Sequence, residues 1–167
     1  METEGTFSEL IIGSIATDVI RKTKTPIILV PEKAQFKKIQ KITLAYDYKL
    51  KQEVNILQPL KELIITSKAE FYILNVGKEE PEQDPEKAIA AIKLEKYFSG
   101  VTFTPYFAQS EDFTAGVNKF IELENIDLIA MIPPTHIRLE RVFNESHTKK
   151  IAFHANVPLL TLPEINS

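Results

Sequence analysis

An internal repeat is the feature that most constrains how this chain folds. Residues 13–32 and 145–164 lie 132 positions apart, and each reads as a helix followed by a short apolar stretch between two prolines. The prolines are Pro26, Pro31, Pro158 and Pro163. Proline is tolerated at the first residue of a strand and stops a strand at its far end, so each stretch predicts a short strand. A coincidental likeness between two helix–strand pairs is the alternative.

Apolar character is retained at the aligned positions of the two copies. The matched pairs are Val19/Ile151, Ile27/Leu159, Ile28/Leu160 and Val30/Leu162. Near-continuous apolar residues are typical of strands that are covered on both faces. Strands that are left unpaired would present open edges, so we expect residues 27–30 to pair with residues 159–162, either within one chain or between two molecules.

Between the two copies the chain alternates between strand and helix patterns. Strands are expected at residues 39–46, 71–76, 101–107, 126–132 and 158–163. Helices are expected at residues 50–67, 84–100, from the cap 110–112 through Ile121, and near 146–155. Five strands alternating with four helices predict an α/β fold, a parallel sheet with helices on both faces, preceded by a helix–strand fragment.

Local signals define two of these elements more closely. Asp84 is suited to cap a helix that has Pro85 at its first position, and we expect Ile89, Ile92 and Tyr97 to form its buried stripe. Pro105 should break the third strand or place it at an edge. In sheets of this kind, ligands bind beyond the carboxyl ends of the strands, which directs attention to the loops after residues 46, 76 and 132.

Composition excludes several classes of function. The 20 basic and 23 acidic residues are spread along the chain, which predicts no nucleic-acid or anionic-membrane surface. The absence of cysteine excludes disulfides, thiol nucleophiles and cysteine-bound metal, and it fits a cytoplasmic protein. The N-terminus is acidic, unlike a signal peptide, and no apolar run is long enough to span a bilayer.

Three motifs in this order resemble the universal stress protein family. They are the strand end Ala45-Tyr46-Asp47, the segment Ile126-Asp127-Leu128-Ile129-Ala130-Met131, and a closing helix followed by a strand between prolines. The resemblance covers residues 37–164 as a full domain and roughly residues 5–31 as the tail of another, as in a tandem member. It implies that residues 1–31 are the closing helix and strand of a preceding domain, 32–36 a linker, and 37–167 the complete domain. It also implies a Rossmann-like or flavodoxin-like five-stranded sheet, and dimers in which the closing strands pair.

The resemblance further implies a nucleotide site, which this sequence departs from. Nucleotide-binding members of the family carry glycines after the fourth strand, because glycine lets the backbone and its N–H groups approach phosphates. The three glycine positions fall here on Ile132, Thr135 and Glu145, with Pro133 and Pro134 between the first two. Proline removes a backbone donor, and Glu145 adds negative charge. We therefore expect a degenerate site that does not bind phosphates in the family's way.

Three remnants of that site remain in the sequence. The resemblance places Asp47 and Val76 beside the base and sugar, and Ser146 after the last glycine position. The two closing strands favour a non-catalytic stress-response module with no cofactor. The three remnants support the alternative, a protein that binds ATP or AMP with weak or no hydrolysis. No Ser-His-Asp order, carboxylate pair or Walker-type loop predicts catalysis.

The histidines and the basic residues near them are weaker candidates for a site. His147 and His154 are seven residues apart, too far along one helix for ordinary metal binding, and His136 has no partner at a zinc-like spacing, so no metal is expected. The basic stretch 136–141, continued by Lys149 and Lys150, could meet an anionic ligand or partner. The alternative is a solvated loop whose charge is partly offset by acidic residues.

Overall fold

The computed structural model describes residues 18–20, 22–31, 34, 35, 37–48, 54–80, 84–132 and 157–163. Residues 18–20 and 22 are helical. The elements that follow are β1 (Ile27–Leu29), β2 (Lys41–Ala45), η1 (Val54–Leu57), α2 (Gln58–Ser67), β3 (Glu70–Gly77), α3 (Pro85–Tyr97), β4 (Thr104–Gln109), α4 (Phe113–Glu124), β5 (Leu128–Met131) and β6 (Leu159–Thr161). The helix expected near residues 146–155 lies outside the described residues.

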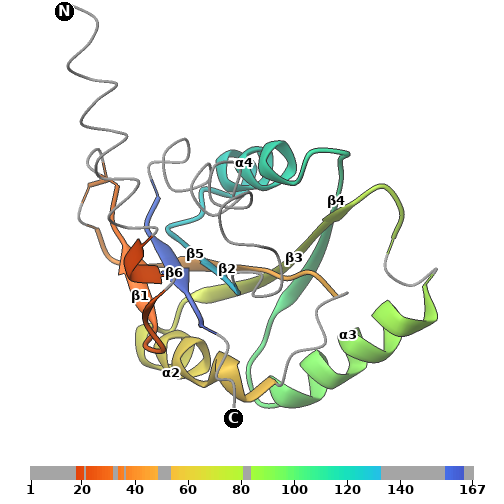
Figure 1. Cartoon of the computed structure of the whole chain (residues 1–167), viewed down its shortest axis with the longest axis horizontal. Helices are drawn as coiled ribbons and strands as arrows, with labels where there is room; N and C mark the ends of the chain where they lie inside the picture. Colours follow the sequence, from red (N-terminus) through yellow and green to blue (C-terminus); the bar gives the residue numbers. More distant parts are fainter. Residues whose placement is uncertain are drawn as a thin grey trace, which may run out of the picture.

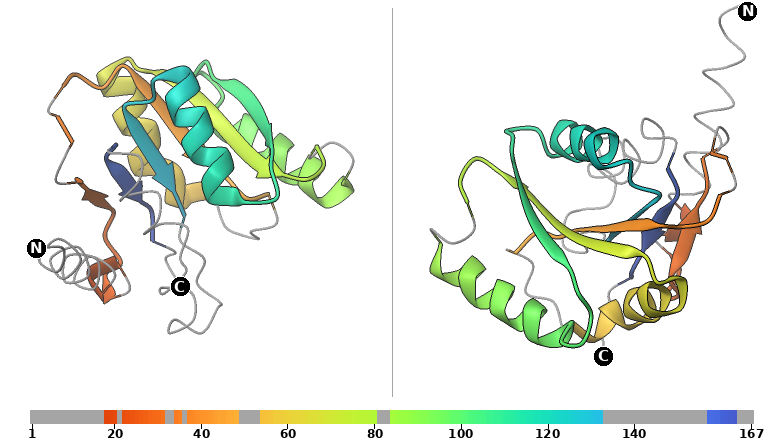
Figure 2. Two further views of the ribbon diagram at one scale, coloured as in Figure 1. Left: turned by 90° about the horizontal axis from the view of Figure 1, so that it is seen from above. Right: turned by 180° about the vertical axis from the view of Figure 1, so that it is seen from behind.

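One sheet organises the molecule, with the strand order β1-β6-β5-β2-β3-β4 (Figure 1). The five strands from β6 to β4 run parallel, which confirms the predicted α/β architecture. β1 adds a sixth strand antiparallel to β6, with Ile28 opposite Leu160. Two segments more than a hundred residues apart in sequence therefore lie side by side at one edge (Figure 2). They are the two strands that the repeat identifies.

Helices cover both faces of this sheet (Figure 1). η1, α2 and α3 pack on one face, where the core includes Leu60, Ile64 and Phe98. α4 packs on the other face through Val117 and Phe120. The strands between them read as apolar runs because both of their faces are covered, and all four residues of β5 are buried.

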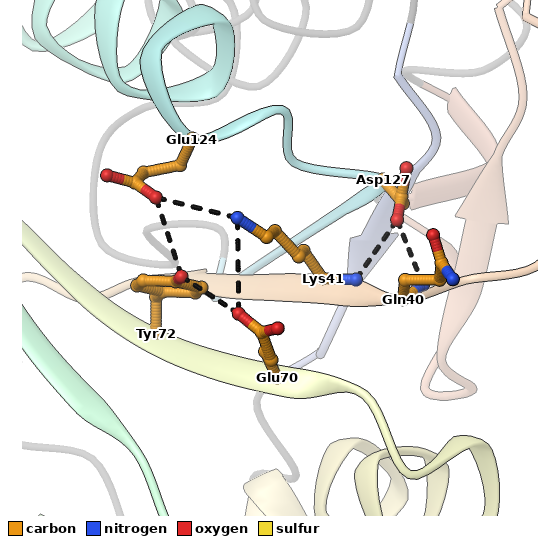
Figure 3. Close-up of polar contacts among 6 residues, drawn as sticks. All are labelled: Gln40, Lys41, Glu70, Tyr72, Glu124 and Asp127. Carbon is orange, nitrogen blue, oxygen red and sulfur yellow. Dashed lines mark hydrogen bonds and ion pairs between the residues drawn. The ribbon is translucent and has the colours of Figure 1, made fainter.

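β2 begins at Lys41 rather than at residue 39, where the sequence pattern predicts it, because the Asp127 side chain takes the place of a backbone partner for this strand. Asp127 Oδ2 accepts the N–H groups of Gln40 at 2.9 Å and of Lys41 at 3.0 Å (Figure 3). The Lys37 ammonium lies 2.5 Å from the other carboxylate oxygen. Burial alone would raise the pKa of Asp127, but these hydrogen bonds outweigh it and hold the pKa below its ordinary value. Asp127 therefore joins the starts of β2 and β5.

A cluster of four polar side chains, Lys41, Glu70, Tyr72 and Glu124, lies at the same end of the sheet (Figure 3). The Tyr72 hydroxyl is 3.2 Å from a Glu70 carboxylate oxygen and 3.4 Å from one of Glu124. Lys41 Nζ is 3.9 Å and 3.6 Å from the same two carboxylates. Ion pairs with this degree of exposure contribute little to stability, so the group mainly orients the end of α4 against β2 and β3.

The caps of α3 and α4 follow from their sequences. Asp84 Oδ1 accepts the Glu86 N–H at 3.0 Å, with Pro85 at the first helical position, and Asp112 Oδ1 accepts the Ala115 N–H at 2.8 Å. β4 begins at Thr104 rather than at residue 101, because the Val101 N–H turns back to the Phe98 carbonyl at 2.8 Å. β4 is the edge strand of the described sheet, and this position tolerates Pro105.

Of the three residues predicted to form one stripe of α3, Tyr97 is half-buried against the core, but the two isoleucines are not. Ile89 and Ile92 are 56% and 64% exposed, and Leu94 is the buried residue of the helix. Ala88 and Ala91, both half-buried, share the inward side with Leu94. The helix therefore turns its small side chains toward the sheet and its larger isoleucines toward solvent.

Candidate functional site

A pocket of about 450 Å³ lies beyond the carboxyl ends of β2, β3 and β4. The fold predicts a ligand site in this place, because loops from neighbouring parallel strands converge there. Its lining comes from four regions: the end of β2, the end of β3, the first turn of α3 and the start of α4. The site is thus assembled from residues that are distant in the sequence.

The structure brings Asp47 and Val76 to this pocket. Asp47 follows β2 and is exposed. Val76 lies two residues beyond Leu74, whose carbonyl accepts the Tyr46 N–H at 2.9 Å. Alternate residues of a strand direct their backbone groups to the same side, so the Val76 N–H and carbonyl point toward the end of β2. Ser146, the third predicted residue, lies outside the described residues.

Asn75 holds the ends of β2 and β3 together. Its amide nitrogen donates to the Tyr46 carbonyl at 3.0 Å, and the residue is buried. A buried amide must keep its hydrogen bonds, so this contact fixes the direction in which the chain enters Asp47. Tyr46 also lines the pocket, and its ring meets edge to face that of Tyr48, which is not among the lining residues, with centroids 5.3 Å apart. Burial, and then the Asp47 carboxylate, raise the pKa of Tyr46.

The far wall of the pocket depends on the close approach of α4 to β3. The Ser110 N–H donates to the Gly77 carbonyl at 2.9 Å, and its hydroxyl donates to the Asp112 carbonyl at 2.8 Å. A Cβ at Gly116 would lie 2.5 Å from Val76 Cγ1, so only glycine allows this separation. Gly116 therefore supports the position of Val76 from behind.

Charges of both signs surround the opening. Lys78 Nζ lies 2.9 Å from Glu111 Oε1, both side chains being exposed, and Lys87, Glu79 and Asp47 complete the charged lining. The mixture suits a small polar molecule with hydrogen-bonding groups for Asp47. The described lining contains no glycine-rich phosphate loop, and the segment 133–145, where the proline-containing loop was expected, lies outside the described residues.

Sequence reasoning missed Asn75, Lys87, Ser110 and Glu111 as lining residues. Asn75 carries a signal that could have identified it, because it is a polar residue inside the apolar strand pattern 71–76. The other three carry no such signal. The structure alone shows that their elements converge.

His136, His147 and His154, together with the basic stretch 136–141, lie outside the described residues. Within the part of the chain that is described, no group of three or more histidine, aspartate or glutamate residues is arranged to hold a metal ion. No described helix has both the length and the apolar composition required to cross a membrane.

Comparison with known proteins adds structural likeness without sequence likeness. No protein-family model matches the chain, and no curated protein matches its sequence. A universal stress protein from Archaeoglobus fulgidus DSM 4304 superimposes with a TM-score of 0.72 at 15% identity, covering 95% of this chain and 56% of that one. A putative universal stress protein from Pseudomonas aeruginosa UCBPP-PA14 gives 0.65 at 9% identity, covering 88% and 55%.

The chain therefore spans a little over half the length of these two proteins. A shorter structure, a universal stress protein from Archaeoglobus fulgidus in complex with dAMP, gives a TM-score of 0.51 at 13% identity and covers 75% of this chain and 99% of that one. Likeness at such low identity concerns the fold. It supports the resemblance in the sequence at that level: this chain has the fold of the universal stress proteins.

Proposed function

We propose that this chain is a universal stress protein-like, non-catalytic module of the cytoplasm that acts by pairing its closing strands with those of another domain or subunit. The observation that carries the proposal is the environment of β1. Ile28 and Val30 are 49% and 68% exposed, whereas the residues aligned with them in the repeat, Leu160 and Leu162, are buried. β1 is also the edge strand of the described sheet, so it leaves both an open edge and an exposed apolar face that a further domain could cover.

The extent of the structural matches supports the same proposal. The two shorter universal stress protein structures from Archaeoglobus fulgidus superimpose over almost their whole length, but they match only about three quarters of this chain. The longer Archaeoglobus fulgidus protein matches 95% of it. The β1 region adds to the single-domain fold, and an additional unit of similar fold is the partner that would use it. The partner could belong to the same polypeptide or to a second molecule.

Light scattering on the purified protein tests whether β1 mediates association. Wild-type protein should show a mass above that of the monomer. Ile28→Lys should lower the measured mass toward that of the monomer, because it places a charge on the apolar face of β1. Ile65→Lys is the matched control, because Ile65 is similarly exposed on α2. A wild-type protein that remains monomeric at high concentration would remove the main support for this proposal.

A second candidate function is binding of an adenine nucleotide, ATP or AMP, with weak or no hydrolysis. The pocket that unites Asp47 and Val76 favours it, and one structure with this fold was solved in complex with dAMP. An exposed carboxylate is a suitable acceptor for sugar hydroxyls or an amine. The retained residues are suited to the nucleoside more than to the phosphates.

Thermal melting with millimolar adenosine, AMP and ATP tests this second function. A ligand present at ten times its Kd stabilises the folded state by about 1.4 kcal/mol, which gives a measurable rise in Tm. Adenosine and AMP should raise Tm at least as much as ATP, and Asp47→Asn should reduce the rise while Glu122→Gln, on the exposed side of α4, should not. Absence of any shift would eliminate nucleotide binding, and sustained ADP release would contradict a non-catalytic role.

A further inference from the structure

A second cavity, of about 650 Å³, lies between α3 and the edge of the sheet formed by β3 and β4. It is larger than the pocket at the carboxyl ends of the strands. Asn75 contributes to both cavities and so lies between them. The second cavity extends under the helix rather than across the strand ends, so it is a separate site.

The composition of α3 explains why this space is not filled. Ala91 lines the cavity, while Ile89 and Ile92 point to solvent. Leu94 contributes the large aliphatic side chain that reaches the sheet from the middle of the helix. The space is open to solvent on one side, and concave sites with mostly apolar walls are where small molecules bind.

The walls of the cavity carry aromatic rings. Tyr48 follows β2, whereas Phe103 and Phe107 come from the segment that forms β4. Phe103 is held in place by Phe71 and Phe98, with ring centroids 6.3 Å and 6.5 Å away. Burial, and then the neighbouring Tyr46, raise the pKa of Tyr48, so its phenol stays neutral at pH 7. The faces of such rings attract cations within about 6 Å.

The charge of the lining has one sign. Glu80, after β3, and Glu95, on α3, are its ionisable acids, and none of the described residues that line the cavity is basic. The pocket at the strand ends differs, because Lys78 and Lys87 lie among its acidic groups. Aromatic walls together with carboxylates, and without a basic residue in the described lining, are complementary to a positively charged apolar molecule.

We propose that the cavity beneath α3 binds a small organic cation, an amine or quaternary ammonium that carries apolar groups. The apolar part would occupy the space between Leu94 and Phe103, and the charge would face Tyr48 or Phe107 with Glu80 and Glu95 in reach. The proposal does not depend on nucleotide binding or on strand pairing, because neither involves these side chains.

The test compares two probes of the same shape that differ in charge. Phenyltrimethylammonium and its neutral isostere tert-butylbenzene are titrated separately, at matched submillimolar concentrations, into isotope-labelled full-length protein and followed by NMR. The cation should shift resonances of residues 91–95 and 101–107 and bind about tenfold more tightly than the neutral probe. Equal affinity, no binding of the cation, or shifts confined to other regions would overturn the proposal.

Charge-neutral variants locate the effect. Glu80→Gln and Glu95→Gln keep the side-chain shape, and each should weaken binding of the cation about threefold or more while leaving the neutral probe unaffected. Glu122→Gln removes an exposed carboxylate elsewhere on the surface and should change nothing. Ala91→Phe narrows the cavity with a large side chain and should weaken binding of both probes with little change in Tm. Unchanged affinity in both glutamine variants, or in Ala91→Phe, would contradict the proposal.

Discussion

Helices α4 and α3 cover opposite faces of the same sheet, and they do so in different ways. α4 buries Val117, Phe120 and Ile121, and it approaches β3 so closely that Gly116 has no room for a Cβ. α3 buries Leu94 within its span, exposes its two isoleucines and leaves a cavity of about 650 Å³. One face therefore has a filled core, and the other keeps space that a ligand could occupy.

The connections that follow the two helices also differ in the contacts that hold them. α4 ends at Asn125, which has a φ of 55°, and the chain then passes through Asp127, whose carboxylate binds two backbone N–H groups of the segment that enters β2. α3 is followed by Gly100 with a φ of 87° and by Val101, which bonds back to Phe98. The described contacts thus fix the end of α4 to two strands, whereas the end of α3 is held by α2, since Lys61 Nζ donates to the Tyr97 carbonyl at 2.7 Å.

The largest expected effect concerns the filled face. Phe120 is buried, with the rings of Tyr106 and Tyr72 at centroid distances of 4.5 Å and 5.7 Å. Phe120→Ala should lower the free energy of unfolding by about 3–5 kcal/mol, because it removes apolar burial and leaves a cavity. Urea denaturation measures the change, and Ile92→Ala on α3 is the control. Similar losses for both variants would refute the contrast between the two helices.

The next effect concerns the carboxylate that follows α4. Asp127→Asn removes the charge but keeps the shape, and it should cost about 1–2 kcal/mol at pH 7, because bonds from backbone N–H groups to a carboxylate are stronger than those to an amide. Denaturation at several pH values measures this cost.

The pH dependence of that cost has a defined sign. The pKa of Asp127 is held below its ordinary value, so its contribution is complete above the unfolded pKa of about 3.9 and is lost as pH falls through the lower folded pKa. The difference between wild type and Asp127→Asn should therefore be constant from pH 7 to about pH 5 and shrink below pH 4. A difference that grows on acidification would contradict the depressed pKa.

The third effect tests how close α4 lies to β3. Gly116→Ala gains about 1 kcal/mol of helix propensity, but its Cβ would clash with both methyl groups of Val76 and with Ser110 Cβ, an overpacking that costs about 1–3 kcal/mol. The net result should be a loss of about 1 kcal/mol. Ala115→Gly, at an exposed position beside it, is the control for propensity alone. A stabilised Gly116→Ala variant would show that α4 has room to move away.

Sequence patterns predicted the strands of this fold better than the orientation of its helices. Proline positions and apolar runs located β1 and β6, and the open edges that unpaired strands would leave predicted that they would pair. For α3, the two isoleucines on one stripe led the sequence pattern to predict that stripe as the buried face. Ala88 and Ala91, on the other side of the helix, are the residues that face the sheet. Alanine carries almost no hydrophobic signal, so periodicity identified the wrong face.

The candidate site was predictable only where its residues follow strands. Asp47 follows a strand and Val76 lies near the end of the next, so parallel pairing alone brings them to one edge. Lys87 and Ser110 reach the same pocket from the start of α3 and the end of β4, through packing that no local pattern records. The start of β2 was misjudged because the Asp127 side chain, 86 residues away from Lys41, replaces its backbone partner.

The smallest expected effect is also the most direct test of the orientation of α3. If Ile89 and Ile92 face solvent, Ile89→Gln and Ile92→Gln should each change the free energy of unfolding by less than about 0.5 kcal/mol. Leu94→Ala on the inward side should cost about 2 kcal/mol or more, because it removes a buried side chain. Urea denaturation of the three variants decides between the two faces: a helix that buried its isoleucines would reverse the ranking, and the cavity beneath it would be filled.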